Sequence, residues 1–516
     1  MPEDKINVTG TRDALETFSF ENSNGHKVHR EGVFIGDPDD GTLKAQVTAG
    51  GELQVTIPEV TSSGELQVAI PSVTDGDSVS VQIAATGDMI SADGALKTEM
   101  ASQVQFGTQQ VVRVANANEQ LDAFARLRVS NPETVFDSKQ IHNDGALFWD
   151  DAQVSGAGTG SVWTQNTAST VLSVSAATAG NRVRQSYRRF NYQPGKSQLV
   201  VITGSLGNVA GETGIKRSMG YYDDSNGFFV QDNEGTVQIV RRSNVTGTPV
   251  DTEIDQANWN LDRLDGTGNS GITLDPSKSQ IFFLDIEWLG VGRVRTGFFV
   301  DGLPLYTHEF LHANNLSGVY MSTPNLPLRY EISNDGNGGA SSIEAICGSV
   351  MSEGGIQGIG QNRSASLDAA YVEANTVGTI YALVGIRLKA GNIDGVVELV
   401  AQSTMSDTAD NYKLMVIFNP TVAGTPAWTD EANSVVQVGR ADLIGSPSNT
   451  TVTGGTVVYS EYVKSSNTTG ASSGDLRSSL QIGSAIDGTP DEMWLCVMPL
   501  GANADITSCL TWRELS

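Results

Sequence analysis

The sequence predicts an all-β protein: an N-terminal arm and oligomeric β stalk, followed by two jelly-roll-like (concanavalin-like) β-sandwich domains. Three observations lead to this fold class. Almost no segment keeps a helical period of apolar residues over ten positions, whereas many short segments alternate apolar and polar side chains as half-buried strands do. Glycine supplies 56 of the 516 residues, above the usual share of about 7 %, which is typical of turn-rich β proteins.

The first predicted part, residues 1–118, combines an anchoring arm with a repeat-built stalk. Residues 1 to about 35 are polar and keep no period, so we expect an irregular attachment arm. Farther along, GELQVTIPEV at 51–60 returns as GELQVAIPSV at 64–73, and a degraded strand, SVSVQI, follows at 78–83. Such short strands bury too little apolar area to fold alone, so they must pack on a neighbouring repeat or another copy. We expect an oligomeric stalk, most simply a trimer; a small sandwich within one chain is the alternative.

Two β-sandwiches are predicted to follow, at 119–355 and 356–516. In both, strand-like segments alternate with Gly, Asn and Asp turns, which is the pattern of antiparallel sandwiches. The glycine-rich stretch at 351–364 sets the boundary near 355, and the second unit has the size of one more sandwich. The clearest strands of the first sandwich are predicted at 197–204, 218–224, 226–232, 236–243, 280–290 and 293–302.

The net charge of the chain excludes two classes of partner. It carries 59 acidic against 32 basic residues, a net charge of −27, so phosphate-bearing nucleic acid and anionic membrane surfaces would repel it. No stretch of 18 apolar residues and no secretory signal is visible, so we expect no membrane insertion and assembly in a cytoplasm. Three cysteines, Cys347, Cys496 and Cys509, are too few for a disulfide framework and lack zinc-site spacing, so we expect buried or half-buried thiols.

A literal HExxH string runs from His308 through Glu309 to His312. Zinc peptidases use this spacing because it places both histidines on one face of a helix. Here the string follows strand-like residues and the turn at 301–302. On an extended chain the two histidines lie roughly 13 Å apart, at about 3.3 Å per residue. We therefore expect ordinary histidines and not zinc ligands.

Asp285 and Glu287 stand two apart in FFLDIEWLG, so on a strand they would share one face. Laminarinase-type glycoside hydrolases present their acid and nucleophile in this way. Those enzymes need a further glutamate two residues earlier, where this chain has Phe283. We expect residues of a polar sheet face, and no glycanase.

Other candidate groups have weaker patterns. Acidic turns supply oxygen ligands that suit calcium, but none has the twelve-residue loop spacing, so solvated turns are expected. An arginine cluster, expected on one alternating strand, would pair with the chain's own carboxylates or dock an acidic neighbouring subunit. Turn-flanking tryptophans are candidates for carbohydrate or protein binding, with core or rim positions as the alternative. The turns are 37–41 (Asp37, Asp39, Asp40), Asp150–Asp151 and Asp223–Asp224; the arginines are Arg182, Arg184, Arg188 and Arg189; the tryptophans are Trp149, Trp163, Trp259 and Trp428. The sequence thus predicts no catalytic, cofactor-binding or metal-binding residue, and no enzyme.

Longer strings carry a family resemblance. LDAFARLRVSNPETVFDSKQIHNDGALFWDD at 121–151 and RQSYRRFNYQPGKSQLVVITG at 184–204 are similar to a family of tailed-bacteriophage virion structural proteins, a group of minor virion, fibre or spike components. The segments at 216–232, 284–302, 307–315 and 320–332 extend the likeness. It covers about 120–355 well and continues loosely to the end. The resemblance implies a virion location and a non-enzymatic role; it supplies no catalytic site and no receptor.

Together these observations predict a structural component of a tailed-phage virion. We expect an oligomeric, most simply trimeric, surface fibre, spike or decoration protein that its N-terminal segment anchors to capsid, neck or tail. The alternative is a host-receptor or glycan-binding adhesin of the tail, and a third possibility is a polysaccharide depolymerase. Expected partners are further copies of the chain, other virion proteins, and a host surface glycan or protein.

Overall fold

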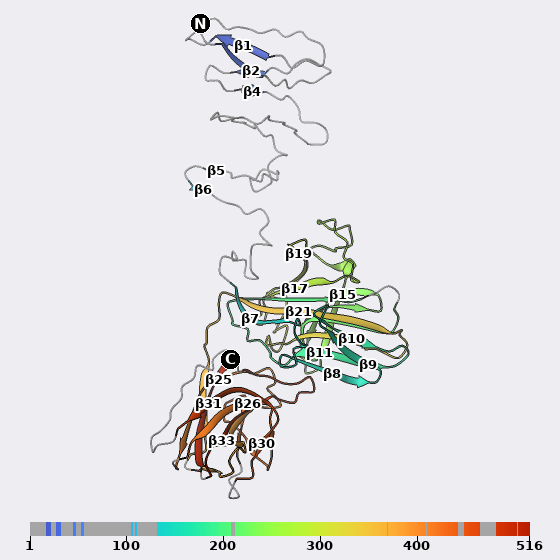
Figure 1. Cartoon of the computed structure of the whole chain (residues 1–516). Helices are drawn as coiled ribbons and strands as arrows, with labels where there is room; N and C mark the ends of the chain where they lie inside the picture. The colour runs from blue at the N-terminus through green and yellow to red at the C-terminus, as the bar shows by residue number, and fades with distance from the viewer. Residues whose placement is uncertain are drawn as a thin grey trace. The chain divides into compact units, whose positions relative to one another are not determined.

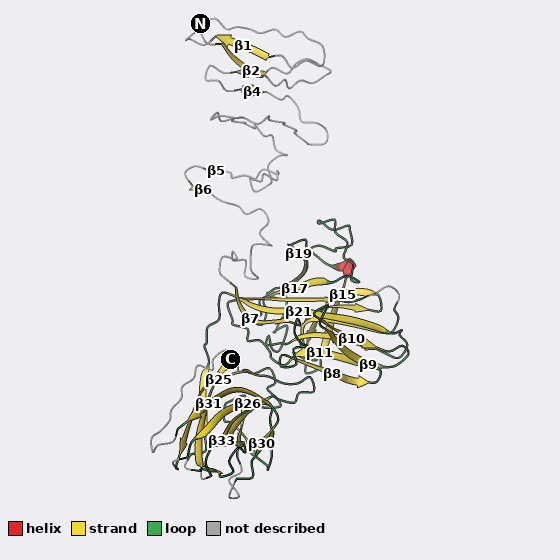
Figure 2. Cartoon of the chain, viewed as in Figure 1, coloured by secondary structure: helices red, strands yellow, loops and turns green. Residues whose placement is uncertain are grey.

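The computed structural model divides the chain into two compact units, Met1–Arg113 and Val114–Ser516 (Figure 1). In the second unit it describes residues 132–207, 212–368, 370–408, 410–441, 448–464, 481–502 and 504–515. Strands and loops make up nearly all of this part, which contains one 3-10 turn, Gln256–Asn258, and no α-helix (Figure 2). The predicted all-β class is therefore confirmed.

Six short strands are described in the first unit. β1 (Thr17–Glu21) pairs with β2 (Lys27–Glu31) in an antiparallel hairpin, so the prediction of an irregular arm over residues 1–35 is wrong for these segments. β3 (Ala45–Val47) pairs with β4 (Leu53–Val55), which belongs to the first repeat copy, and β5 (Gln105–Phe106) pairs with β6 (Gln109–Gln110). The second copy, the strand at 78–83 and the acidic turn at 37–41 lie outside the described residues.

Between residues 132 and 353, the described strands form a sandwich of two antiparallel sheets. The eight-stranded sheet contains, in spatial order, β19 (Leu303–Phe310), β18 (Val294–Val300), β17 (Gln280–Ile286), β12 (Ser197–Ser205), β21 (Ser341–Glu353), β10 (Ser169–Val174) and β9 (Thr159–Thr164), with β7 (Pro132–Lys139) paired to β21. The seven-stranded sheet contains β16 (Val250–Asp255), β15 (Thr236–Ser243), β14 (Gly227–Asn233), β13 (Ile215–Tyr222), β20 (Leu328–Asn334), β11 (Gly180–Ser186) and β8 (Trp149–Gly156).

Alternation along each strand decides which side chains enter the core between these sheets. Phe282, Leu284 and Ile286 of β17 point inward, as do Met219 and Tyr221 of β13, and all belong to one buried cluster. β15 coincides with its predicted range, 236–243, whereas β17 ends four residues before the predicted 290. The chain turns there because Leu289 and Gly290 both adopt positive φ, 36° and 80°.

The second sandwich follows a connection between Glu353 and Gln361. Its described five-stranded sheet contains β22 (Gln361–Ser366), β34 (Ala504–Leu515), β25 (Val396–Ser406) and β32 (Gln481–Ile482), with β23 (Val372–Ala374) paired to β34. Its described six-stranded sheet contains β28 (Ala427–Asp430), β29 (Val436–Arg440), β24 (Tyr381–Leu388), β33 (Glu492–Pro499), β26 (Tyr412–Phe418) and β31 (Thr456–Val463). A separate apolar core, which includes Trp512, Leu414 and Leu495, lies between them.

Candidate functional site

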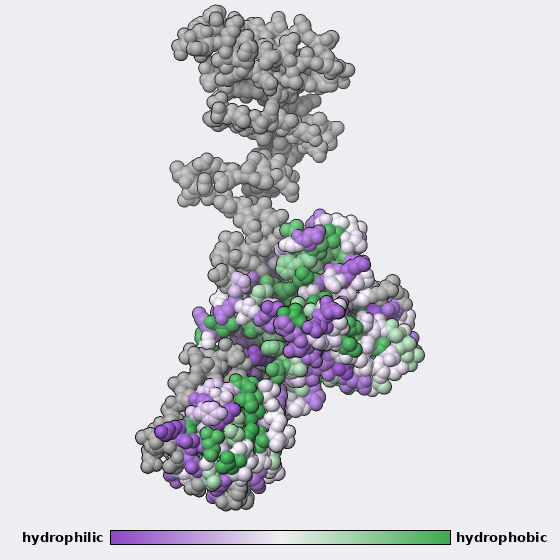
Figure 3. Space-filling view, in the orientation of Figure 1, coloured by the Kyte–Doolittle hydropathy of each residue, from purple (hydrophilic) through white to green (hydrophobic). Residues whose placement is uncertain are grey.

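The outer face of the seven-stranded sheet, which points away from the core, is polar. Its side chains alternate with the buried core residues of the same strands, so Lys216 and Ser218 of β13 face outward while Ile215 and Met219 face inward. Hydrophilic residues are also widespread on the face of the first sandwich drawn in Figure 3. The outer face of the seven-stranded sheet is the candidate functional site.

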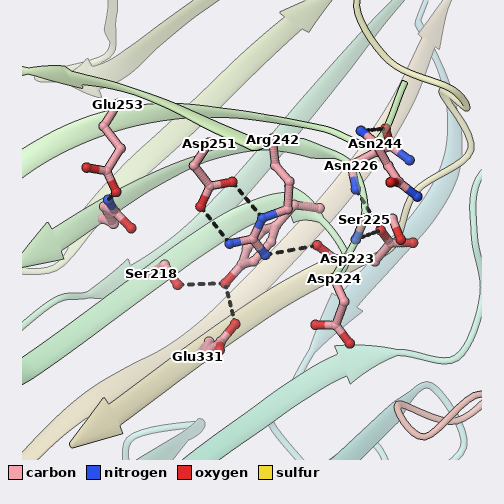
Figure 4. Close-up of polar contacts among 12 residues, drawn as sticks. Ser218, Asp223, Asp224, Ser225, Asn226, Arg242, Asn244, Asp251, Glu253 and Glu331 are labelled. Carbon is pink, nitrogen blue, oxygen red and sulfur yellow. Dashed lines mark hydrogen bonds and ion pairs between the residues drawn. The ribbon is translucent and has the colours of Figure 1, made fainter. Parts of the chain in front are cut away.

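Arg242 of β15 organises one end of the face. Its guanidinium donates two hydrogen bonds to Asp251, at 2.8 and 2.9 Å, and a third to the carbonyl of Asp223 at 3.2 Å (Figure 4). It lies 5.7 and 5.2 Å from the ring centroids of Tyr222 and Phe229, which are buried beneath it. Burial alone would lower the pKa of Arg242, but the hydrogen bonds and charge of Asp251 outweigh it and raise that pKa.

A second ion pair continues the network on β20. Arg329 is only 2 % exposed and donates to Glu331 at 3.1 Å, and it also pairs with Asp224 at 2.7 Å. Glu331 further accepts hydrogen bonds from Asn181 at 2.8 Å and from the Tyr222 hydroxyl at 3.3 Å. Burial, together with the charge of Glu331, raises the pKa of Tyr222, so its hydroxyl remains a donor.

Amide side chains connect the outer strands of this face. Gln231 donates to Gln238 at 2.7 Å and to Glu253 at 3.1 Å, and Gln238 donates to Asp255 at 2.7 Å. Because each group restrains the next, the face presents fixed donors and acceptors.

A hollow of about 420 Å³ opens at the opposite end of the face, where β8 and β20 end and β11 and β13 begin. Its size is within the range of small-ligand sites. Glycines let the surrounding loops close in: a Cβ on Gly214 would lie 2.4 Å from Asp335 Oδ1, and one on Gly180 would lie 2.2 Å from the Ala157 carbonyl oxygen. One row of register partners across five adjacent strands lines it: Ser155, Asn181, Ser333, Lys216 and Asn233.

The composition of the hollow decides what it can bind. Amide and hydroxyl groups both donate and accept hydrogen bonds. The lining also contains one basic side chain, Lys216, and two acidic ones, Glu234 and Asp335. Such a lining has no excess of positive charge to hold a phosphate or sulfate, but it matches the hydroxyl groups of an uncharged sugar.

The HExxH string lies elsewhere and is not helical. His308 is in strand β19, and its Nδ1 accepts a hydrogen bond from the backbone N–H of Asn260 at 3.3 Å. Burial lowers the pKa of His308 to about 4. His312 follows the strand, stacks on Tyr320 with a centroid distance of 3.9 Å, and hydrogen-bonds the Gly292 carbonyl through Nδ1 at 2.6 Å. The two imidazoles are therefore parts of the first sandwich's packing.

The carboxylates Asp285 and Glu287 do not share a strand face. Asp285 is fully buried and accepts a hydrogen bond from Arg295 Nε at 3.0 Å. Strand β17 ends at Ile286, so Glu287 lies in the following turn, where its carboxylate accepts the Arg293 amide at 3.4 Å. The glycanase-like arrangement is absent from this pair.

The acidic turns use their oxygens within the protein. Asp223 Oδ1 accepts the amides of Ser225 and Asn226, at 2.8 and 2.9 Å, and Asp224 pairs with Arg329. Asp150 accepts the amides of two residues, Asp151 at 2.8 Å and Ile486 at 2.7 Å. Among the residues that the structure describes, no group of three or more His, Cys, Asp or Glu side chains is arranged to hold a metal ion.

The arginine cluster pairs with the chain's own carboxylates. Arg182 and Arg184 both contact Asp151, and Arg189 contacts Asp223. The prediction of a single strand is wrong for the last two arginines, because β11 ends at Ser186 and Arg188 and Arg189 follow it.

The four candidate tryptophans separate into two kinds. Trp149 and Trp259, each 3 % exposed, are core residues of the first sandwich. Trp163 is half-buried and donates to the Gln140 carbonyl at 2.7 Å, and Trp428 is half-buried on the edge strand β28. The three cysteines are free thiols, and Cys496 is buried.

Sequence reasoning missed most of the candidate site. Arg242, Asp251, Arg329, Glu331 and the residues of the hollow were not singled out, because each is an ordinary polar residue of a strand. The available signal was alternation: in VDTEID at 250–255, every second residue is acidic, which marks one wholly polar face.

Comparisons with known proteins give only distant likenesses. No family model matches the chain, and a search of curated proteins finds no match. Among solved structures, the chain is similar to the CBM2 module of the evolved Dit of Lactobacillus casei BL23 phage J-1, with 8 % identity over 44 % of this chain and 99 % of that one, and a TM-score of 0.30. It is also similar to an endo-1,3-beta-glucanase from Streptomyces sioyaensis (10 % identity, 43 % and 96 % covered, TM-score 0.27) and to a legume lectin-like domain from Entamoeba histolytica (8 %, 42 % and 96 %, 0.26). Likeness at this level identifies neither ligand nor activity. No helix in the described part of the chain is long and apolar enough to cross a membrane.

Proposed function

We propose that this chain is a carbohydrate-binding surface protein of a tailed-phage virion, and that the hollow of the first sandwich takes an uncharged, hydroxyl-rich ring. The observation that carries the proposal is the hollow itself: about 420 Å³, lined by a row of amide, hydroxyl and amine groups at the end of a rigid polar sheet face. Rigid walls with placed polar groups reduce the cost of ordering the site when a ligand binds.

Calorimetric titration of the full-length protein with β-linked hexasaccharides of glucose, galactose and mannose tests this function. The double variant Lys216→Ala/Asn233→Ala removes two polar groups of the hollow, and we expect at least a tenfold loss of affinity at this site. Lys139→Ala is the matched control, because Lys139 is exposed on β7 of the other sheet. Lack of binding to all three sugars, or an equal loss in the control, would contradict the proposal.

The virion location rests on the family resemblance of residues 121–151 and 184–204, and the acid excess of the chain is compatible with it because it limits adhesion to packaged DNA. We propose that the N-terminal segment anchors an oligomer, most simply a trimer, to the particle. Antibody labelling of purified phage and light scattering of the isolated chain test the two parts. Unlabelled particles would reject the virion role, and a monodisperse monomer would reject the oligomer.

A binding role, and not a catalytic one, is part of the proposal. The pairing of Asp285 with Arg295 supports it, since a buried, paired carboxylate is poorly placed to attack a sugar. Release of oligosaccharide from host capsule by the wild-type protein, abolished in Glu287→Gln, would favour a polysaccharide depolymerase instead.

A further inference from the structure

The outer face of the six-stranded sheet in the second sandwich carries an aromatic row of unusual construction. Trp428, Gly439, Gly385 and Trp494 are register partners across four adjacent strands, β28, β29, β24 and β33. The two glycines leave the space that the indole of Trp494 fills: a Cβ on Gly385 would lie 2.4 Å from its Cδ2, and one on Gly439 would lie 2.7 Å from its Cη2. Trp494 is therefore pressed flat against the sheet and is fully buried.

Trp428 packs against Trp494. Its ring meets Trp494 edge to face, with a centroid distance of 5.2 Å and an interplanar angle of 71°. The guanidinium of Arg387 lies 4.1 Å from the Trp428 ring centroid. Trp428 is half-buried on an edge strand, so part of the indole remains exposed in an orientation that two neighbours fix.

A polar row lies directly beside the aromatic one. Asp430, Gln437, Arg387 and Glu492 are the next register partners across the same four strands. Each is hydrogen-bonded to the next: Gln437 Nε2 to Asp430 Oδ1 at 2.8 Å, Arg387 Nε to Gln437 Oε1 at 2.8 Å, and Arg387 Nη1 to Glu492 Oε1 at 3.0 Å. This series of hydrogen bonds ends at Glu492, whose Oε2 accepts a hydrogen bond from the Trp494 indole N–H at 2.9 Å.

Another part of this outer face is covered. β27 (Thr421–Val422) and β30 (Val452–Thr453) form a short ladder, and Val422 and Val452 pack with Met415, Ile417 and Cys496 of the sheet. The aromatic and polar rows therefore lie next to a covered apolar cluster and are themselves partly open: Arg387 and Glu492 are 27 % and 26 % exposed.

We propose that Trp428, with Asp430, Gln437 and Arg387, forms a second binding site, which takes one ring of an uncharged pyranose oligosaccharide. The indole face that Arg387 does not cover offers a flat apolar surface to the C–H face of the sugar, and the adjacent amide and carboxylate groups bind its equatorial hydroxyls. The row holds two carboxylates and one guanidinium, so it disfavours an anionic glycan. The site lies on a different sandwich from the hollow and does not depend on it.

The test isolates this site in full-length protein that carries Lys216→Ala/Asn233→Ala, so that the hollow does not contribute. Titration with the same three hexasaccharides should show one remaining site. Adding Trp428→Ala should weaken binding at least 30-fold, whereas Trp428→Tyr, which keeps a ring, should remain within about fivefold. Asp430→Ala changes an exposed side chain and should weaken binding about threefold to tenfold.

Tyr462→Ala is the matched control, because Tyr462 is a 74 % exposed aromatic residue on β31, at the opposite edge of the same sheet. It should change affinity less than twofold. No binding of any of the three sugars in the Lys216→Ala/Asn233→Ala background, unchanged affinity in Trp428→Ala, or an equal loss in Tyr462→Ala would overturn the proposal. Binding that Trp428→Ala removes while the hollow variants have no effect would reject the first site and keep the second.

Discussion

The outer faces of the seven-stranded and six-stranded sheets differ in how aromatic and charged side chains are layered on them. In the first sandwich, charged side chains lie over buried aromatic rings: Arg242 covers Tyr222 and Phe229. In the second, the half-buried ring of Trp428 contacts Trp494, which itself packs over two glycines, Gly385 and Gly439. On the first face, the ion pairs of Arg242 and Arg329 are part of the packing over these rings, whereas on the second face part of the Trp428 indole stays exposed. Stability should therefore respond strongly to changes in the ion pairs of the first face, and only weakly to changes in the exposed residues beside Trp428.

Glu331→Ala should have the largest effect on stability. Arg329 is 2 % exposed, and removal of Glu331 leaves it only one carboxylate partner, the 67 % exposed Asp224. The buried charge is then poorly compensated, which costs about 3 kcal/mol. Denaturant unfolding with amide exchange measured on β13 and β20 assigns the loss to the first sandwich. Asp430→Ala, on the other face, should change stability by less than about 0.5 kcal/mol. Equal losses for the two variants would remove the distinction between the faces.

Gly385→Ala should destabilise the second sandwich by roughly 1–3 kcal/mol, because the added methyl overlaps the Trp494 ring and the sheet is already packed there. It should also reduce sugar binding at Trp428 by displacing its support. Gly391→Ala is the control, since a Cβ there meets nothing within 4 Å. A stable Gly385→Ala variant with unchanged tryptophan fluorescence would contradict the described packing.

A pH difference should also separate the sandwiches, because all five histidines precede residue 313 and the second sandwich has none. Burial lowers the pKa of His308 from 6.5 to about 4, so between these values the unfolded chain binds more protons and stability falls as pH falls. From pH 6.5 to 5.5 this amounts to about 1 kcal/mol, at about 1.4 kcal/mol per pKa unit.

Asp232 acts in the opposite direction, because burial raises its pKa to about 6 despite the nearby Arg217. The measurement is therefore the slope of the free energy of unfolding of the first sandwich against pH, compared between the wild-type protein and His308→Gln. Identical slopes in the two proteins would show that His308 is not buried as described.

Asp251→Ala should have the smallest effect among the ion-pair changes on the first face. Arg242 and Asp251 are 20 % and 26 % exposed, so solvent screens the pair and its loss should cost no more than about 1 kcal/mol. The difference from wild type should shrink in 1 M salt. A loss as large as that of Glu331→Ala would mean that the whole polar face is one cooperative network.

Much of the fold follows from local pattern. The strand at 236–243 and the turns at 233–235 and 301–302 were predictable, because alternation and Asn/Asp-Gly chemistry act between neighbours in sequence; Glu234 and Asp301 indeed adopt positive φ, 53° and 51°. The hairpin of β1 and β2 was missed although Phe18 and Phe20 alternate with polar residues in β1, because this alternation spans only five residues and β2 has a single apolar residue, Val28.

The sequence by itself determined the all-β class, the position of most central strands and the rejection of a helical zinc site at His308 and His312. Only the tertiary structure decided which polar residues meet. Asn181, Lys216 and Ser333 come from strands far apart in the sequence, and Trp428 and Trp494 are 66 residues apart. Strand order and register bring them into common rows, and these depend on long-range pairing that no local pattern encodes.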